Sequence, residues 1–236
     1  MFELDARLSA AASFVRRGKR VCDVGTDHGY LAVFLLKEGM VPFVTACDVN
    51  EKPLQAAKAH AKQYDVLDRI GFILSDGLQA VPSENAEDIV ICGMGGELIA
   101  SIIGACSYIK EGDRRLILQP MTQIPFLRRY LLTNGFVIER EKAVCDRHHC
   151  YTVMMCRYGG SPTVPNELFC HTGMLPFEKT AESYQYLKRE AQRLARIAAG
   201  VEKSNPQDER VQHCRMLAKQ IQALLKGWKR NEQTAE

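Results

Sequence analysis

The stretch Asp23-Val24-Gly25-Thr26-Asp27-His28-Gly29-Tyr30-Leu31 follows a short apolar run and precedes a segment of helical spacing. Glycines in such a turn let the backbone pass close to a ligand, and amide N–H groups at the start of a helix attract a carboxylate or a phosphate. A plain tight turn between a strand and a helix has the same pattern. The stretch therefore predicts a strand, a turn and a helix, and its surroundings decide whether the turn binds a ligand.

Short apolar runs alternate with helical patterns from residue 20 to residue 133. The runs have no polar alternate face, as expected for parallel strands covered by helices on both sides. The alternation predicts right-handed crossovers and a doubly wound, Rossmann-like α/β sheet. Its predicted strands are Val21–Val24, Phe43–Ala46, Ile70–Leu74, Ile89–Cys92 and Leu116–Leu118.

Two later apolar runs, Phe136–Val144 and Tyr151–Cys156, have no helical pattern between them. We predict that they form an antiparallel pair at the sheet edge, an addition typical of class I methyltransferase sheets. Residues 157–176 contain several glycines and prolines, so a loop-like linker is expected there. The predicted division is a Rossmann-like domain over residues 1–160, a linker over residues 161–176 and a helical hairpin over residues 177–236.

The hairpin is predicted from apolar residues that recur at alternating spacings of three and four, on both sides of a break at Ser204-Asn205-Pro206. These spacings are typical of antiparallel helices with coiled-coil seams. The seam residues before the break are Tyr184, Leu187, Ala191, Leu194, Ala198 and Val201, and those after it are Val211, Cys214, Ala218, Ile221, Leu225 and Trp228.

The composition is that of a folded globular protein, with 46% hydrophobic and 25% charged residues. No stretch approaches the roughly 18 apolar residues of a membrane span, so we predict no membrane partner and a cytoplasmic location. The net charge is +3, but residues 175–230 hold 12 Lys and Arg against 6 Asp and Glu. This excess predicts a polyanionic partner at the hairpin, although the solvated face of a coiled coil has the same composition.

The nine cysteines include no Cys-x-x-Cys pair, and Cys22, Cys47 and Cys92 lie in apolar runs. Buried reduced thiols are the expected state. The tract Cys145-Asp146-Arg147-His148-His149-Cys150 contains zinc-ligand types, but its spacing matches no common zinc module. We predict that the protein binds no metal, and the sequence indicates no obligate protein partner.

Two more acidic motifs follow predicted strands. Asp48 lies about 20 residues beyond the glycine turn, where a carboxylate can accept hydrogen bonds from both ribose hydroxyls. Asp76, in Asp76-Gly77-Leu78, can accept from the exocyclic amine of adenine, with Leu78 as an apolar wall. A helix N-cap at Asp48 and a surface turn at Asp76 are the plain alternatives. Three such motifs in order predict a nucleoside site.

The nature of the nucleoside depends on Asp27. Dinucleotide-binding turns read Gly-x-Gly-x-x-Gly, and their middle glycine admits a pyrophosphate. Here Asp27 stands at that position between Gly25 and Gly29, and its charge would repel a pyrophosphate. A carboxylate is compatible with the ammonium and sulfonium charges of S-adenosylmethionine, which is therefore the predicted cofactor.

A fourth motif, Gly93-Met94-Gly95-Gly96-Glu97, follows the fourth predicted strand, where methyltransferases of this fold face the methyl acceptor. Its glycines offer an open floor for a flat base, and Met94 can pack on the face of that base. The alternative is a helix N-terminal turn that binds nothing. Gln119-Pro120-Met121, after the fifth predicted strand, is a candidate for a hydrogen-bonding wall.

These motifs together resemble the bacterial tRNA (adenine-N1)-methyltransferases that modify position 22. The resemblance rests on the residues at 23–31, 48–50, 76–78, 91–96 and 118–120, and it includes Arg7-Leu8 and the terminal hairpin. It implies a Rossmann-like core that binds S-adenosylmethionine and a hairpin that contacts tRNA. The sequence departs from the family at Ala32, where members commonly have Pro, and in the tract at residues 146–150.

The expected cofactor-binding residues are Asp23, Gly25, Thr26, Asp27, His28, Gly29, Asp48, Val49, Asp76, Gly77, Leu78, Gly93 and Met94. The expected substrate-binding residues are Arg7, Gly93, Met94, Gly95, Gly96, Gln119, Arg189, Arg193 and Arg196.

The adenine N1 lone pair can attack a sulfonium methyl group without prior loss of a proton, so catalysis is expected to be mainly positioning. Asp27 and His28 are catalytic candidates only in the sense of orienting the base. Methylation of another RNA base or a small molecule, and RNA binding without catalysis, are the alternative functions.

Overall fold

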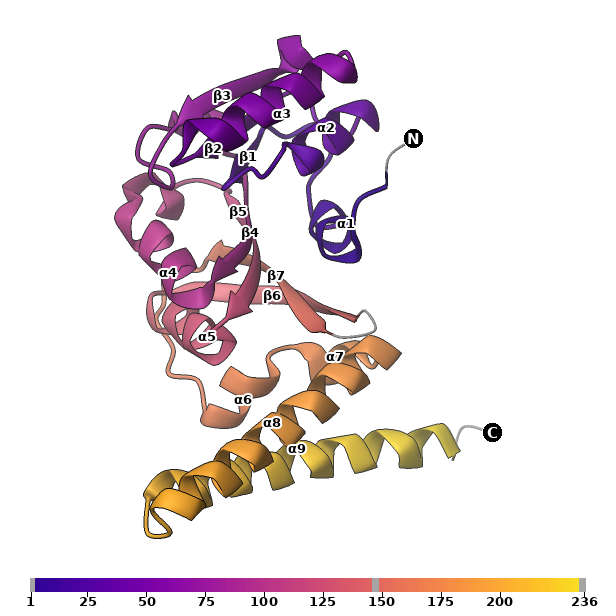
Figure 1. Cartoon of the computed structure of the whole chain (residues 1–236), viewed down its shortest axis with the longest axis vertical. Coiled ribbons are helices and arrows are strands. Elements are labelled where there is room, and N and C mark those ends of the chain that lie inside the picture. The colour runs from indigo at the N-terminus through magenta and orange to yellow at the C-terminus, as the bar shows by residue number, and fades with distance from the viewer. Residues whose placement is uncertain (1–2, 146–148, 234–236) are drawn as a thin grey trace.

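The computed structural model describes residues 3–145 and 149–233 (Figure 1). Five strands, β1 to β5, run parallel, and two longer strands, β6 and β7, form an antiparallel pair. The sheet order is β3-β2-β1-β4-β5-β7-β6, which confirms the predicted Rossmann-like sheet with an antiparallel pair at its edge. The strands are β1 Val21–Val24, β2 Val44–Asp48, β3 Ile70–Leu74, β4 Asp88–Gly95, β5 Arg115–Thr122, β6 Phe136–Cys145 and β7 Cys150–Tyr158.

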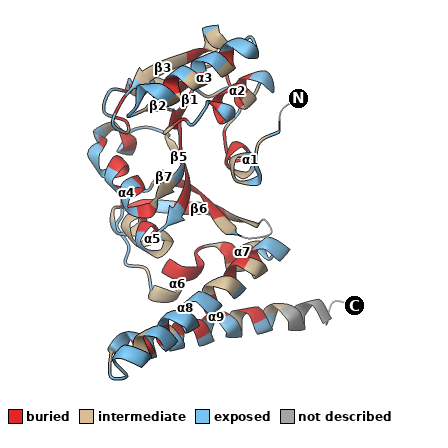
Figure 2. Cartoon of the chain, viewed as in Figure 1, coloured by how far each residue is buried: buried red, intermediate tan, exposed pale blue. Residues whose placement is uncertain are grey.

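Helices cover both faces of the sheet (Figure 1). In β5, Leu116 and Leu118 pack toward α4 and α5, whereas Ile117 between them packs toward α1, α2 and α3. Burial on both faces explains why the central parallel strands read as continuous apolar runs. Figure 2 shows red, buried residues in the centre of the sheet, whereas β3 at its edge is mainly half-buried. The helices of this domain are α1 Ala6–Ala12, α2 Tyr30–Lys37, α3 Glu51–Gln63, α4 Gly96–Ala105 and α5 Ile124–Thr133. Single 3-10 turns form at Leu67–Arg69, Ser83–Asn85 and Ser107–Lys110.

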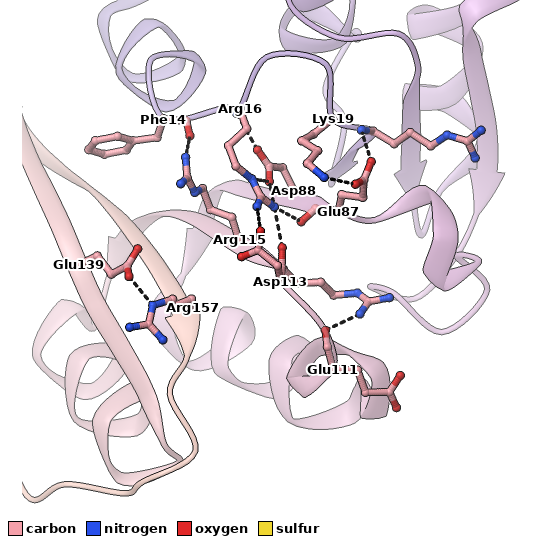
Figure 3. A network of polar contacts seen from close by, with 12 residues as sticks. Phe14, Arg16, Lys19, Glu87, Asp88, Glu111, Asp113, Arg115, Glu139 and Arg157 are labelled. Atoms are coloured by element: carbon pink, nitrogen blue, oxygen red, sulfur yellow. Dashed lines mark hydrogen bonds and ion pairs between the residues drawn. The ribbon is translucent and has the colours of Figure 1, made fainter.

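At the end where β4 begins, ion pairs of Arg16 fasten the N-terminal segment to the sheet, and the pair with Asp88 is buried (Figure 3). The Asp88 carboxylate is fully buried and accepts hydrogen bonds from the backbone N–H and Nε of Arg16, both at 2.7 Å. The same guanidinium contacts Asp113 at 2.5 Å. A buried charge is tolerated when it is paired and hydrogen-bonded. This end of the sheet is therefore structural, and it leaves the opposite edge for the functional loops.

The segment expected to be a loop-like linker folds into two short helices, α6 Glu167–Thr172 and α7 Leu175–Glu178. The reason is a buried ion pair that composition does not reveal. Arg128 of α5 donates to Glu141 of β6 at 2.6 Å and to the carbonyl oxygen of Cys170 at 2.7 Å, and both charged side chains are fully buried. Glu141 in turn accepts from the backbone N–H of Met174 at 2.9 Å. The connecting segment is thus bound to the sheet.

The hairpin consists of α8 Ala181–Ser204 and α9 Glu209–Gln233, and its turn lies at the predicted break. The predicted seam is buried at most of its positions, including Leu187, Leu194 and Ile221. Helix α8 packs on β6, so the hairpin lies at the end of the sheet away from β3 (Figure 1). Within residues 3–145 and 149–233, no helix is long and apolar enough to cross a lipid bilayer.

The expectation of reduced thiols is wrong for two of the nine cysteines. Cys145, the last residue of β6, and Cys150, the first of β7, form a disulfide. Their neighbouring strand ends bring them together, although five positions separate them in sequence. Cys22 and Cys47 are free and buried, as expected, and Cys92 is free and half-buried. Asp146, Arg147 and His148 of the same tract lie outside the described residues.

The buried pair gives a prediction for stability. Replacing Glu141 with Gln leaves the Arg128 charge buried without its partner, so we expect the free energy of unfolding to fall by about 3 kcal/mol. Glu139→Gln on the same strand breaks an exposed ion pair with Arg157 (Figure 3) and should cost about 1 kcal/mol or less. Urea denaturation of both variants measures the difference, and equal losses would contradict a structural role for the buried pair.

Candidate functional site

The carboxyl ends of the five parallel strands meet at one edge of the sheet. The strand order β3-β2-β1-β4-β5 places the motifs side by side along this edge. Their spatial order is Asp76, Asp48, the glycine turn at residues 23–31, the Gly93 loop at residues 93–97, and Gln119. Such an edge is where α/β sheets bind ligands. The structure thus brings together motifs that lie far apart in the sequence.

Hydrogen bonds to the neighbouring strand β2 hold the glycine turn in place. Gly25 and Thr26 donate their backbone N–H groups to the carbonyl oxygen of Cys47, at 2.8 and 3.1 Å, so these two amides are directed into the fold. The Thr26 hydroxyl donates to Asp23 at 2.8 Å. Gly25 and Gly29 both have positive φ angles, of 75° and 65°. A Cβ on Gly29 would lie 2.9 Å from the Cβ of Ala57 in α3, so this turn requires glycine.

Asp23 is the buried carboxylate of the site. Burial raises its pKa to about 6, and the nearby charge of Asp48 adds to the rise, while the hydrogen bond from Thr26 lowers it. A buried carboxylate with a raised pKa gains from a nearby cation, because the cation stabilises the ionised form. Asp23 therefore fits a ligand with positive charge better than one with phosphate.

Asp27 and His28 lie on the outer side of the turn. Their side chains are 84% and 54% exposed, and His28 Nε2 lies 3.3 Å from Asp27 Oδ1. The His28 ring lies next to Tyr30, and Tyr30 next to His60, with ring centroids 5.6 and 5.0 Å apart. The proposed orienting role of Asp27 and His28 thus requires a substrate that approaches the turn from solvent.

Asp48 and Asp76 extend the edge toward β3. Asp48 Oδ1 accepts from the backbone N–H of Asn50 at 2.8 Å, which directs the carboxyl group along the start of α3. Val49 beside it is 62% exposed, and Leu74, the register partner of Asp48, is 55% exposed. Exposed apolar side chains next to carboxylates suit a nucleoside, whose base is flat and whose ribose carries hydroxyls. Leu74 was not selected from the sequence because it reads as the end of a strand.

The three residues of the Asp76-Gly77-Leu78 turn have different roles. Asp76 is exposed, whereas Leu78 is buried and packs in the core. Gly77 has a φ of 57°, and a Cβ there would lie 2.9 Å from Ile102 of α4. Gly77 therefore serves the packing of the turn, and Leu78 serves the core, which leaves Asp76 as the side chain available to a ligand.

The Gly93 loop meets the glycine turn through Met94. A Cβ on Gly25 would lie 2.2 Å from Met94 Cε, so the methionine side chain rests on the bare backbone of Gly25. This contact joins the expected cofactor loop to the expected acceptor loop. Strand β4 extends to Gly95 with a register shift, where the sequence predicted a loop after Cys92. Gly96 begins α4, and a Cβ there would lie 2.5 Å from the carbonyl oxygen of Gln123.

Arg7 and Gln119 also meet at this edge. Arg7 Nη1 donates to Gln119 Oε1 at 3.1 Å, its guanidinium lies over the Tyr151 ring at 5.4 Å, and it pairs with Asp5 at 2.8 Å. Helix α1 is thus fastened beside the Gly93 loop. Tyr151 and Asp5 were missed by sequence reasoning, because nothing in their local pattern distinguishes them.

The hairpin arginines face the end of β5 across a groove of ≈ 630 Å³. Residues 121–125 line one wall, and Arg189, Arg193 and Arg196 of α8 lie on the other. Arg193 donates to Glu190 through two bonds of 2.7 Å, and His171 contacts the same carboxylate at 2.6 Å. Although burial acts to raise it, these hydrogen bonds lower the pKa of Glu190 to about 2. His171 of α6 therefore links to α8 through Glu190, and Arg193 holds that carboxylate within α8; Arg193 and Arg196 are both exposed in the groove.

No cluster of three or more metal-ligating side chains occurs among residues 3–145 and 149–233. Three carboxylates, two exposed apolar side chains and a glycine turn fit an adenosyl group that carries positive charge.

Comparison with known proteins agrees with this chemistry. Residues 4–154 match a family model described as a methyltransferase domain. The tRNA (adenine(22)-N(1))-methyltransferase of Bacillus subtilis is 28% identical over 194 residues, which span 81% of this chain and 82% of that protein.

Two solved structures are similar along nearly the whole chain. A protein of the NADB-Rossmann superfamily from Streptococcus agalactiae has a TM-score of 0.84 and 28% identity, over 95% of this chain and 98% of that chain. A Streptococcus pneumoniae protein in complex with S-adenosyl-L-methionine has a TM-score of 0.81 and 28% identity, over 94% and 100% of the two chains. The family model covers more than half of the sequence, and the edge carries the matching chemistry; the chain belongs to the methyltransferase domain family.

Proposed function

We propose that this protein is an S-adenosylmethionine-dependent methyltransferase that modifies N1 of an adenine in tRNA, at position 22. The observation that carries the proposal is the row of Asp76, Asp48 and Asp23 beside the glycine turn, next to the Gly93 loop. The B. subtilis relative, named for this activity, matches over four fifths of both chains. S-adenosylmethionine supplies an electrophilic methyl group on a sulfonium centre.

In this proposal, different residues of the edge contact different parts of the cofactor. In this proposal Asp48 accepts hydrogen bonds from the ribose hydroxyls. The exposed side chains of Val49 and Leu74 offer apolar surface to the adenine ring. We propose that the exposed Asp76 accepts a hydrogen bond from the adenine amine. The charge of Asp23 favours the cationic amino-acid end.

The acceptor side works mainly by positioning. Adenine N1 carries a lone pair at neutral pH, so no protein base has to remove a proton before the methyl group is transferred. The Gly93–Gly96 loop provides a floor for the base, with Met94 at the junction to the cofactor loop. Asp27 and His28 are exposed beside this junction and are candidates for orienting the adenine N6 amine.

The tRNA is proposed to lie across both parts of the chain. Because N1 is on the Watson–Crick edge, a paired adenine must leave its helix to react. Met121, two residues after Gln119, lines the groove between β5 and α8, so RNA next to the flipped base would reach the hairpin arginines. We retain residues 1–160 as the catalytic domain, residues 161–176 as the connection and residues 177–236 as the hairpin, and we propose that the protein acts in the cytoplasm.

The activity is tested with labelled S-adenosylmethionine and unmodified tRNA. We expect label in N1-methyladenosine, and none when the tRNA carries guanine in place of adenine at position 22. Digestion to nucleosides followed by mass spectrometry identifies the product. Label at another base, label only in small molecules, or no transfer with intact tRNA binding would each contradict the proposal and point to one of the alternative functions.

The groove gives a separate prediction for tRNA affinity. Arg196→Ala removes a positive charge from the groove wall, so we expect KM for tRNA to rise about tenfold at low salt and KM for S-adenosylmethionine to stay unchanged. Lys219→Ala on α9 is the matched control, because Lys219 is exposed but lies outside this groove. Steady-state kinetics at two salt concentrations measure both values. A larger effect of Lys219→Ala would show that RNA contacts another face.

A further inference from the structure

The end of β4 contains a bulge at the point where the acceptor loop begins. Cys92 pairs with Gln119 and Met94 pairs with Pro120, so Gly93 is an extra residue with no partner position on β5. Gly93 has a φ of 81°, the left-handed conformation that favours glycine. A bulge removes a residue from the ladder and re-aims the side chain that follows it. Here that side chain is Met94.

The Gln119 side chain accepts a hydrogen bond from the backbone N–H of Gly93, the residue that the bulge takes out of the pairing with β5. Gly93 donates its N–H to Gln119 Oε1 at 3.1 Å, and the same oxygen accepts from Arg7 at 3.1 Å. Gln119 Nε2 donates to the carbonyl oxygen of Pro120 at 3.1 Å and lies 3.5 Å from Met121 Sδ. Gln119 is fully buried. Two donors face the oxygen and an acceptor faces the nitrogen, so protein groups fix the orientation of the amide.

This arrangement argues against direct contact between Gln119 and a base. A side chain that is buried and engaged at both its oxygen and its nitrogen would have to break an existing bond to recognise a substrate. Its effect on a substrate passes instead through Gly93 to Met94, which rests on Gly25 of the glycine turn. Arg7 extends the same link to α1.

We propose that Gln119 is a positioning residue for methyl transfer. Its hydrogen bond to the Gly93 amide holds the bulge in β4. The bulge directs Met94 onto the glycine turn, and this contact aligns the Gly93 loop, which faces the methyl acceptor, with the turn that binds the cofactor. This inference rests on the proposed methyltransferase activity. It replaces the expected substrate contact of Gln119 with an indirect role. A displacement of about 1 Å in the alignment of reacting groups costs on the order of a hundredfold in rate.

Two variants separate the reach of the side chain from its chemistry. Gln119→Asn keeps the amide but is too short to reach Gly93, so we expect kcat for tRNA methylation to fall about 10- to 100-fold. The affinity for S-adenosylhomocysteine, measured by calorimetry, should change less than about twofold, because the edge carboxylates are untouched. Gln119→Glu gives up the donation to the Pro120 carbonyl oxygen but keeps a charged acceptor for Gly93 and Arg7, and we expect it to retain at least about ten times the kcat of the Asn variant.

A control and a structural readout exclude a simple loss of stability. Ile117→Val, on the same strand, removes a buried methylene group and should lower the free energy of unfolding by about 1 kcal/mol. Its kcat, measured at a temperature below its melting temperature, should equal that of the wild type. Hydrogen exchange at the Gly93 amide should accelerate in Gln119→Asn and stay near the wild-type rate in Gln119→Glu. If Gln119→Asn does not fold, Gln119→Met, which has a similar length and no acceptor oxygen, serves the same comparison.

The outcomes are distinct. A kcat close to wild type in Gln119→Asn, despite faster exchange at Gly93, would overturn the inference. So would a uniform loss of kcat, cofactor affinity and melting temperature, or a Gln119→Glu variant as slow as Gln119→Asn. If the wild-type protein itself fails to methylate tRNA, the proposed function fails instead, and the exchange at Gly93 still shows whether Gln119 holds the bulge.

Discussion

The whole site depends on one constraint, the parallel pairing of β1 to β5. Parallel strands all end at the same edge, so the loops after them converge even though they are spread over about a hundred residues of sequence. The beginning of β4, at the opposite edge, is closed by the Arg16–Asp88 ion pair. The fold thus separates a structural end from a functional end, where Asp76 is exposed and Asp48 is half-buried, so that both can contact a ligand.

Further interactions determine the shape of the site that the parallel strands bring together. The cofactor half of the edge is shaped by backbone: positive φ angles, and glycines pressed against Ala57, Ile102 and Met94. The acceptor half is shaped by side chains, since Gln119 holds the bulge and Arg7 fastens α1 beside it. The Arg128–Glu141 pair then fixes the segment that leads to the hairpin, so the groove between core and hairpin has a defined shape.

Periodicity predicted the strands, the antiparallel pair and the hairpin because burial on one or two faces leaves a regular apolar pattern. The motifs at Asp23, Asp48 and Asp76 were found from their positions after strands. The Gly93 bulge, the buried Arg128–Glu141 pair and the Cys145–Cys150 disulfide were not predicted, because each joins residues whose local sequence is ordinary and whose meeting depends on tertiary packing. The helices at residues 167–178 were missed for the same reason: their glycines and prolines read as a loop, whereas bonds to Arg128 and Glu141 order them.

The central claim is that the edge formed by these strands is a site for S-adenosylmethionine, and calorimetric titration tests it most directly. The wild-type protein should bind one S-adenosylmethionine per chain. Asp48→Ala should weaken the affinity at least about tenfold, since it removes a charged hydrogen-bond acceptor. Asp68→Ala, which removes an exposed carboxylate away from the edge, should leave the affinity unchanged. Equal affinity in the Asp48→Ala variant, or no binding by the wild-type protein, would contradict the account.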